Sequence, residues 1–234
     1  MNPLRWLVLS GRHPSAVLLV TQLAGMVLYP FIESTRFGLA GLGVLGTVVL
    51  IVTILMVRRT PGLTWVSTLI ALPAVLLIGA QVLWDLPQLR PFSSGLEAVF
   101  YFYGAGSLIA YMMADRRVST DELFAAGATF TLLAWGFAYL FLLLQSLEPG
   151  SFAGASEADA PRTWTELMFL SFALLSSTGI GDVIPISPLA RGLASVEMFA
   201  GVMYLAAVMA RLIGLTLLTH AEAHPQGGSE RGPL

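Results

Sequence analysis

Residues 163–185 read TWTELMFLSFALLSSTGIGDVIP, and this stretch decides the fold. It opens on Thr163-Trp164-Thr165-Glu166, a capping-box pattern that predicts the start of a helix. The apolar run that follows, residues 167–175, rises about 1.5 Å per residue and reaches less than halfway across a hydrocarbon core about 30 Å thick. A loop of hydroxyls and glycines comes next. Non-helical backbone at membrane depth must be buried in protein or line a water-filled path, so we expect a re-entrant helix and loop.

A short amphipathic helix followed by a glycine-rich turn at the membrane surface is the alternative interpretation of this stretch. A lone G-x-G pattern would not distinguish the two. The order of the segments favours the pore loop, because the chain runs from an apolar span through a polar loop, a capped short helix, a hydroxyl pair, G-x-G-D and a proline into a second span.

The composition excludes most soluble classes of protein. Apolar residues make up 56% of the chain and charged residues 11%, against about 25% charged residues in an average soluble domain. With 12 Arg, no Lys and a net charge of −2, no basic patch for nucleic acid is expected. Cysteine is absent, and His13, His220 and His224 lie near the ends. Without a G-x-S-x-G elbow, an interior histidine or clustered carboxylates, we expect neither an enzyme nor a cofactor.

Six segments are long and apolar enough to cross a membrane, for which about 20 residues are needed. The sequence therefore predicts an all-α integral membrane protein with six transmembrane helices. The short helix and its loop lie between the fifth and the sixth. The expected spans are residues 15–32, 37–57, 60–84, 92–114, 123–147 and 189–218.

The arginines predict the orientation of these spans. With both termini in the cytoplasm, eight arginines lie inside and four outside, in agreement with the positive-inside rule. We expect a multi-pass protein of the cell (inner) membrane with a four-helix region at 1–118, a pore domain at 119–219 and a disordered cytoplasmic tail at 220–234. The inner set is Arg5, Arg12, Arg58, Arg59, Arg116, Arg117, Arg211 and Arg231, and the outer set is Arg36, Arg90, Arg162 and Arg191.

The loop resembles the selectivity filter of potassium channel pore domains, whose pattern is Thr-Val-Gly-Tyr-Gly-Asp. This chain has Ser177-Thr178-Gly179-Ile180-Gly181-Asp182, with both glycines and the aspartate in place. Pro185, Arg191 and Gly201 fall where many such domains carry a proline, an arginine and a hinge glycine. Residues 197–214, EMFAGVMYLAAVMARLIG, are similar to the inner helix of small bacterial potassium-channel-like proteins. The resemblance makes the chain a six-span relative of that module.

The resemblance implies a homotetrameric channel for potassium. Successive carbonyls face one axis only if right- and left-handed backbone angles alternate, and left-handed angles cost little only for glycine. Gly179 and Gly181 lie at alternate positions, as this requires. By the match, potassium would be bound by the carbonyls of Thr178, Gly179 and Ile180 and by the carbonyl and hydroxyl of Ser177. One loop supplies a quarter of each ion site, so four chains must meet on an axis.

Several positions depart from the family pattern. Ser177 replaces Thr, Thr178 replaces Val and Ile180 replaces Tyr, which removes a ring and a phenol that would brace the filter. Two positions of the short helix that are often tryptophan hold Phe169 and Leu170, and neither can donate a hydrogen bond to the filter aspartate. A weakly selective monovalent cation channel is therefore a second hypothesis.

Three residues near the loop have two interpretations each. Asp182 is either part of an acidic ring at the outer mouth or a turn residue that caps the filter exit. Gly201 is either a bend point for opening or a small residue that permits close helix packing. Glu197 either supports the filter or makes a structural hydrogen bond, and its expected partners are Ser171 and Ser176.

Two charged residues lie farther from the loop. Glu97 lies inside the fourth span, where an acid is a functional-site candidate, and no pattern identifies its partner. Arg211 lies near the inner end of the sixth span. We expect it either to reach the inner surface through its long side chain or to bind anionic membrane lipids.

The fourth span also bears on gating. Residues 92–114 hold no arginine, whereas voltage sensors carry arginine at repeated spacing in that span. We therefore expect a passive potassium channel that is not gated by voltage. A non-conducting membrane scaffold or accessory subunit is the third hypothesis.

Overall fold

The computed structural model describes residues 13–33, 35, 38–57, 64–84, 86–114, 120–154 and 160–223. Long helices dominate this part of the chain, as the composition predicts. In chain order the elements are α2 (Pro14–Leu28), α3 (Pro30–Glu33), α4 (Gly38–Val57), α5 (Thr64–Trp84), the 3-10 helix η1 (Pro87–Leu89), α6 (Arg90–Ala114), α7 (Thr120–Leu147), β1 (Phe152–Ala153), α8 (Trp164–Leu175), β2 (Ile184–Pro185) and α9 (Pro188–Ala223).

Four helices of the described part are long and apolar enough to cross a membrane. The first two expected spans are represented by shorter apolar stretches, Pro14–Leu28 and Gly41–Leu55. α2 ends just before Pro30, which has no N–H to continue a helix and begins the separate turn α3. These findings indicate a membrane protein, and a crossing by α2 and α4 stays a prediction. The four long stretches are Trp65–Trp84, Arg90–Ala114, Thr120–Leu147 and Pro188–Arg211.

α7 is the central helix of the bundle and contacts α2, α6, α8 and α9. Its Trp135 and Tyr139 are buried. The ring of Trp135 packs against Tyr101 of α6 and Trp164 of α8, with centroids 5.5 and 5.0 Å away. One aromatic core therefore joins the N-terminal helices to the short helix α8.

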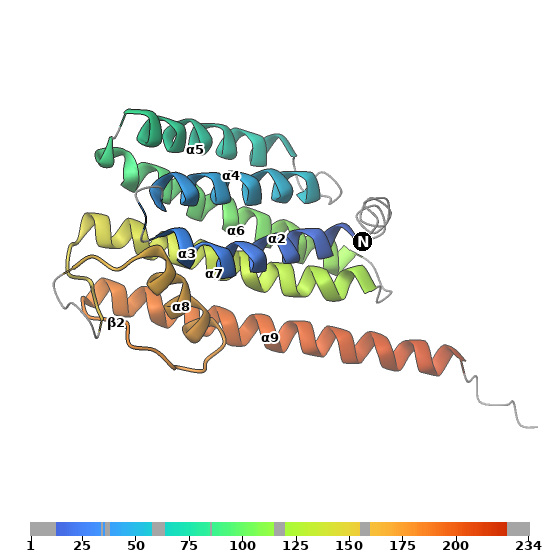
Figure 1. Ribbon diagram of the computed structural model, residues 1–234. Coiled ribbons are helices and arrows are strands. Elements are labelled where there is room, and N and C mark those ends of the chain that lie inside the picture. The colour runs from blue at the N-terminus through green and yellow to red at the C-terminus, as the bar shows by residue number, and fades with distance from the viewer. Residues whose placement is uncertain are drawn as a thin grey trace, which may run out of the picture.

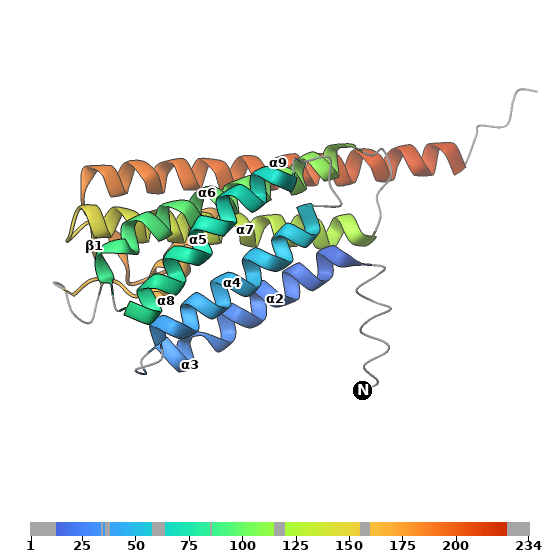
Figure 2. The same cartoon turned by 90° about the horizontal axis from the view of Figure 1, so that it is seen from above.

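α9 lies along one edge of the bundle, and α5 lies at the opposite edge (Figure 1). Helix α9 contacts α7, α8 and β2. Its C-terminal part projects beyond the other helices (Figure 2). Much of its apolar surface is consequently exposed in a single chain. The exposed apolar side chains include Val196, Phe199, Val202, Met203, Met209 and Ile213.

Two expectations concern residues at the edges of the described part. α9 continues to Ala223, so residues 220–223 of the expected tail are helical, and residues 224–234 lie outside the description. Most arginines that predict the orientation also lie outside it. They are Arg5, Arg12, Arg36, Arg58, Arg59, Arg116, Arg117 and Arg231.

Candidate functional site

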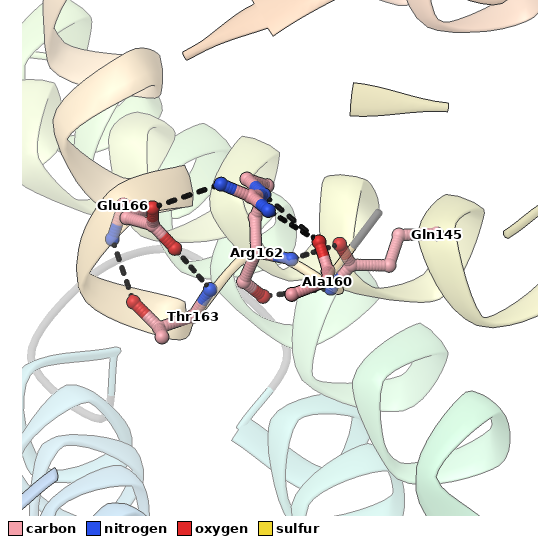
Figure 3. Close-up of polar contacts among 5 residues, drawn as sticks. All are labelled: Gln145, Ala160, Arg162, Thr163 and Glu166. Atoms are coloured by element: carbon pink, nitrogen blue, oxygen red, sulfur yellow. Dashed lines mark hydrogen bonds and ion pairs between the residues drawn. The ribbon is translucent and has the colours of Figure 1, made fainter. Parts of the chain in front are cut away.

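The short helix α8 begins with the predicted capping box. The Thr163 hydroxyl accepts a hydrogen bond from the Glu166 N–H (3.2 Å), and the Glu166 carboxylate accepts one from the Thr163 N–H (2.7 Å; Figure 3). These contacts satisfy N–H groups that the start of a helix leaves without a partner. The sequence-based prediction of this helix start is confirmed.

Arg162 fastens the start of α8 to α7, a role that the sequence analysis missed. Gln145 of α7 donates to the Arg162 carbonyl (2.8 Å) and accepts from the Arg162 N–H (2.7 Å). The buried guanidinium pairs with Glu166 (3.3 Å) and donates to the carbonyl of Ala160 (Figure 3). The four-residue spacing of Arg162 and Glu166 was a signal for this pair, but the Gln145 contact depends on tertiary packing.

α8 ends in a Schellman motif that positions the first residues of the loop. The Ser177 N–H donates to the Leu174 carbonyl (3.0 Å), and the Thr178 N–H donates to the Ala173 carbonyl (3.0 Å). Ser176 is the C-cap. Ser177 has a φ of 57°, the left-handed conformation that this motif requires and that glycine usually provides. The strained backbone at Ser177 is therefore a consequence of how the helix ends.

The two glycines of the loop differ in conformation. Gly179 has a φ of 65°, whereas Gly181 is not among the described residues with positive φ. Left-handed residues thus alternate at Ser177 and Gly179, and the expectation of a left-handed Gly181 is wrong. Directly after Gly181 the chain turns inward, with Val183 buried in an apolar cluster, and then enters β2.

The rest of the loop is exposed in a single chain. Ile180 is 70% exposed, and Asp182 is exposed as well. Asp182 makes no hydrogen bond or ion pair with any described residue. Phe169 of α8 lies beside Gly181, where an added Cβ would be 3.4 Å from its ring, and Leu170 is buried. A bracing partner for Asp182 is thus absent from the described part of the chain.

A buried hydroxyl and carboxyl group meet behind the loop. Ser171 of α8 is hydrogen-bonded to Glu197 of α9 and to the Ala134 carbonyl of α7 (2.9 Å). Ser171 and Glu197 are both 0% exposed. Ser171 is thus the partner of Glu197. The other expected partner, Ser176, instead donates to the Phe172 carbonyl (2.6 Å).

The Ser171 hydroxyl is the donor in this cluster. It donates toward the Glu197 carboxyl group and toward the Ala134 carbonyl, so its one proton is shared between two acceptors. The second carboxyl oxygen of Glu197, Oε2, has no hydrogen-bond partner among the described residues. The arrangement joins three helices at one point behind the loop.

Gly201 allows α9 to approach the end of α8. An added Cβ would lie 1.9 Å from the Leu175 carbonyl oxygen, much closer than real Cβ atoms approach another atom. α9 is continuous through this position. The geometry supports the packing interpretation of Gly201, and bending at this residue stays a prediction.

The segment that leaves the loop is tied to the end of α7. β1 pairs with β2 in an antiparallel register, where the sequence predicted only a polar loop at 148–161. Ser187, the residue before α9, accepts from the Ala190 N–H (3.2 Å) and donates to Glu148 (3.0 Å). Both ends of the loop are therefore anchored to the same helical frame.

Arg211 at the far end of α9 is held by an acid. Its guanidinium lies 3.4 Å from Glu122 at the start of α7, and the two side chains are 17% and 6% exposed. Tyr204, nearer the middle of α9, donates to the Ala126 carbonyl (2.6 Å). Arg211 therefore forms a partly buried ion pair that fastens α9 to α7, and its reach to the inner surface or to membrane lipids stays a prediction.

Within the described part of the chain, no group of three or more histidines and acids could hold a metal ion. The loop from Ser177 to Asp182 instead offers backbone carbonyls, two hydroxyls and one carboxylate. Such oxygen groups bind ions only when several of them surround one point. A single loop does not do this.

Residues 127–217 match the family model described as ion channel. The matched segment runs from α7 through α8 and its loop into α9. No curated protein and no solved structure matches the chain. The family match supports an ion channel built on these helices, the region that the sequence analysis singled out.

Proposed function

We propose that this chain is one subunit of a homotetrameric potassium channel whose filter is the loop Ser177–Asp182. The observation that carries the proposal is the geometry of α8. It has 12 residues, a length of roughly 18 Å, is capped at both ends, and delivers a non-helical loop between two long apolar helices. This geometry fits a re-entrant pore loop, and the ion channel match covers α8, its loop and most of the two flanking helices.

The exposed face of α9 supports assembly around an axis. One loop cannot enclose an ion, and four loops can. In a tetramer, neighbouring subunits would cover the apolar side chains of α9 that a single chain leaves exposed, such as Phe199 and Val202. The C-terminus of each α8 carries roughly half a negative charge, so four such ends near the axis would favour a cation there.

The N-terminal helices complete the proposal. α2, α4, α5 and α6 would be four spans ahead of the pore domain, with both termini in the cytoplasm and the channel in the cell (inner) membrane. After Arg90 at its start, α6 has no arginine that a membrane potential could move. The channel would therefore be passive and insensitive to voltage.

Asp182 and Ile180 favour a second candidate, a weakly selective monovalent cation channel. Asp182 has no partner among the described residues, and Ile180 is 70% exposed and cannot hydrogen-bond through its side chain. Selectivity depends on how firmly the carbonyl oxygens are held. A loop with few lateral contacts would exclude sodium less strictly than a braced one.

Reconstitution into vesicles tests the proposal by comparing potassium and sodium flux. Gly179→Ala is the informative variant, because nothing lies within 4 Å of an added Cβ but φ is +65°. Gly106→Ala in α6 is the matched control, since an added Cβ there is equally unobstructed and no positive φ is involved. We expect the first variant to lower potassium flux at least about tenfold, as misplaced filter carbonyls cost selective binding, and the control to conduct normally.

Each result of this measurement separates the hypotheses. Strong preference for potassium supports the first candidate, and comparable sodium flux supports the second. A protein that is folded and tetrameric but passes neither ion would contradict both and favour a scaffold or accessory subunit. Equal flux through the Gly179→Ala and Gly106→Ala variants would exclude this loop as the filter.

A further inference from the structure

A cavity of about 610 Å³ lies at the end of the bundle where α8 starts. Its walls come from α3, α4, α5, α6, α7, β1, the segment leading into α8 and the first residue of α8, and no residue of the loop 177–182 lines it. Its volume falls in the range typical of small-molecule sites, about 300–1,000 Å³. Such a space beside the pore region is not required for ion conduction and calls for its own explanation.

A polar stripe on α6 lines this cavity. Arg90, Ser93, Ser94 and Glu97 all face it, at spacings that place them on one side of a helix. Gln81 of α5, which also lines the cavity, donates to Ser93 (2.9 Å). The stripe continues inward to an acid within an apolar helix, where a charged group is costly and usually functional.

Glu97 ends this stripe without a cationic partner. It is 4% exposed and forms no ion pair with any described residue. The hydroxyl of Tyr139 is the neighbour that interacts with the Glu97 carboxyl group, and it carries no positive charge. An added Cβ at Gly46 would lie 3.0 Å from Glu97 Oε1 and 3.3 Å from this hydroxyl, so both groups lie close together at the same wall.

The other charges that line the cavity have contacts elsewhere or lie at its exposed end. Arg162 is paired with Glu166, and Glu33 accepts a hydrogen bond from the Thr165 N–H (3.2 Å). Arg90 is exposed. Inside the cavity the Glu97 carboxyl group therefore has no counter-charge, and the guanidinium of Arg90 lies at the open end.

We propose that the cavity binds a small organic monocation, with its ammonium group beside Glu97 and its apolar body against the aliphatic and aromatic walls. A buried carboxyl group is costly to ionise in isolation, and an ammonium ion beside Glu97 would stabilise its charged form. The rings of Tyr139 and Trp164 also line the space, and aromatic faces attract organic cations. Arg90 at the open end disfavours a second positive charge on the ligand.

An occupant of this cavity would contact the helix that precedes the filter. Trp164 is the first residue of α8, and its ring packs against Tyr29 with centroids 5.0 Å apart. The same wall includes Arg162 and Thr163. Binding itself does not depend on conduction, so it is measured on the protein whether or not the protein is a channel.

The first test is isothermal titration calorimetry of the full chain in detergent micelles, with blank micelles subtracted. The probes are 3-phenylpropylammonium, its neutral N-acetyl derivative and hexane-1,6-diammonium. We expect saturable binding of one 3-phenylpropylammonium per chain. The other two probes should bind at least about tenfold more weakly, because the N-acetyl derivative has no positive charge and the diammonium has a second one near Arg90. Equal affinity for the neutral derivative would overturn the proposal.

Variants locate the binding. We expect Glu97→Gln to weaken binding of 3-phenylpropylammonium at least about tenfold by removing the charge. Ser94→Leu keeps the carboxylate but fills part of the cavity, and should weaken binding as well. Glu197→Gln changes the other buried glutamate, which does not line the cavity, and should leave binding unchanged. Unchanged binding in both Glu97→Gln and Ser94→Leu would exclude this site, and if either variant does not fold, the other variant and the probe series decide.

The ammonium group has two natural sources, a soluble amine or the headgroup of an ethanolamine lipid. The titration is therefore repeated in nanodiscs of phosphatidylglycerol alone and in nanodiscs that also contain phosphatidylethanolamine. Weaker apparent affinity for 3-phenylpropylammonium in the second set indicates competition by the headgroup. Equal affinity in both sets indicates that the site takes soluble amines.

Discussion

Helix α6 and helix α9 each bury one glutamate within an apolar stretch, and the surroundings of the two side chains differ. Glu197 in α9 is 0% exposed and meets the hydroxyl of Ser171. Glu97 in α6 is 4% exposed and faces a cavity of about 610 Å³. The same side chain is therefore part of the packing in one region and open to a ligand in the other. An acid within a span indicates a site, but its neighbours decide which kind.

A glycine beside each glutamate provides the sharpest test of this difference. Gly201 admits the backbone of Leu175, and Gly46 admits only the ends of the Glu97 and Tyr139 side chains. Backbone atoms of packed helices cannot move aside, whereas side-chain ends that border a cavity can. Adding one methyl group should therefore lower the free energy of unfolding more at Gly201 than at Gly46.

We expect Gly201→Ala to lower the free energy of unfolding by about 3 kcal/mol, since overpacking against backbone forces the helices apart. Gly46→Ala should cost less than about 1 kcal/mol, because the strain is relieved into the cavity and alanine favours helix. Chemical denaturation in mild detergent, followed by circular dichroism, measures both. Gly214→Ala, with nothing within 4 Å of an added Cβ on the same helix as Gly201, is the control. Equal losses at Gly201 and Gly46 would contradict the comparison.

The serine beside each glutamate gives the next largest effect. Ser171→Ala should cost about 2 kcal/mol, because it leaves the carboxyl group of Glu197 buried without its partner. Ser94→Ala, at the cavity next to Glu97, should cost less than about 0.5 kcal/mol, since its hydroxyl borders the cavity and not a packed partner. The same denaturation assay reports both values. If Ser94→Ala proves the more harmful, then the cavity region is the more tightly packed of the two.

Arg162 connects the two regions, because it lines the cavity and also holds the start of α8. We expect Arg162→Gln to lower the free energy of unfolding by about 1.5 kcal/mol, because the ion pair with Glu166 and the hydrogen bond to the Ala160 carbonyl are lost. Arg191→Gln removes an exposed arginine and should cost less than about 0.5 kcal/mol. Similar values for the two variants would mean that α8 is held by the capping box and Gln145 alone.

The smallest expected effect has the opposite sign. Ser177→Gly should raise the free energy of unfolding by about 1 kcal/mol, because a left-handed residue with a Cβ is strained and glycine is not. Ser195→Gly, on the exposed side of α9, should instead lower it by about 0.5 kcal/mol, the usual loss for glycine in a helix. A loss of stability at Ser177 would show that its hydroxyl, rather than its backbone, dominates there.

Local patterns predicted the start of α8 and missed the conformation of the loop. The capping box at Thr163 depends on atoms within one helical turn, so a few residues of sequence are sufficient to identify it. The left-handed position expected at Gly181 was wrong because two structural requirements outside the loop prevail. The end of α8 places Ser177 in that conformation, and the burial of Val183 extends the chain after Gly181.

The sequence by itself determined the apolar, helical character of the chain and the capped short helix before a G-x-G-D loop, because these follow from composition and from contacts within a few residues. Only the tertiary structure decided which distant groups meet. Glu197 finds Ser171 26 positions away and Arg211 finds Glu122 89 positions away. The cavity at Glu97 is lined by residues of α3, α4, α5, α6, α7 and β1, by the segment before α8 and by the first residue of α8. Such pairings depend on how the helices pack against one another, and local sequence patterns do not specify that arrangement.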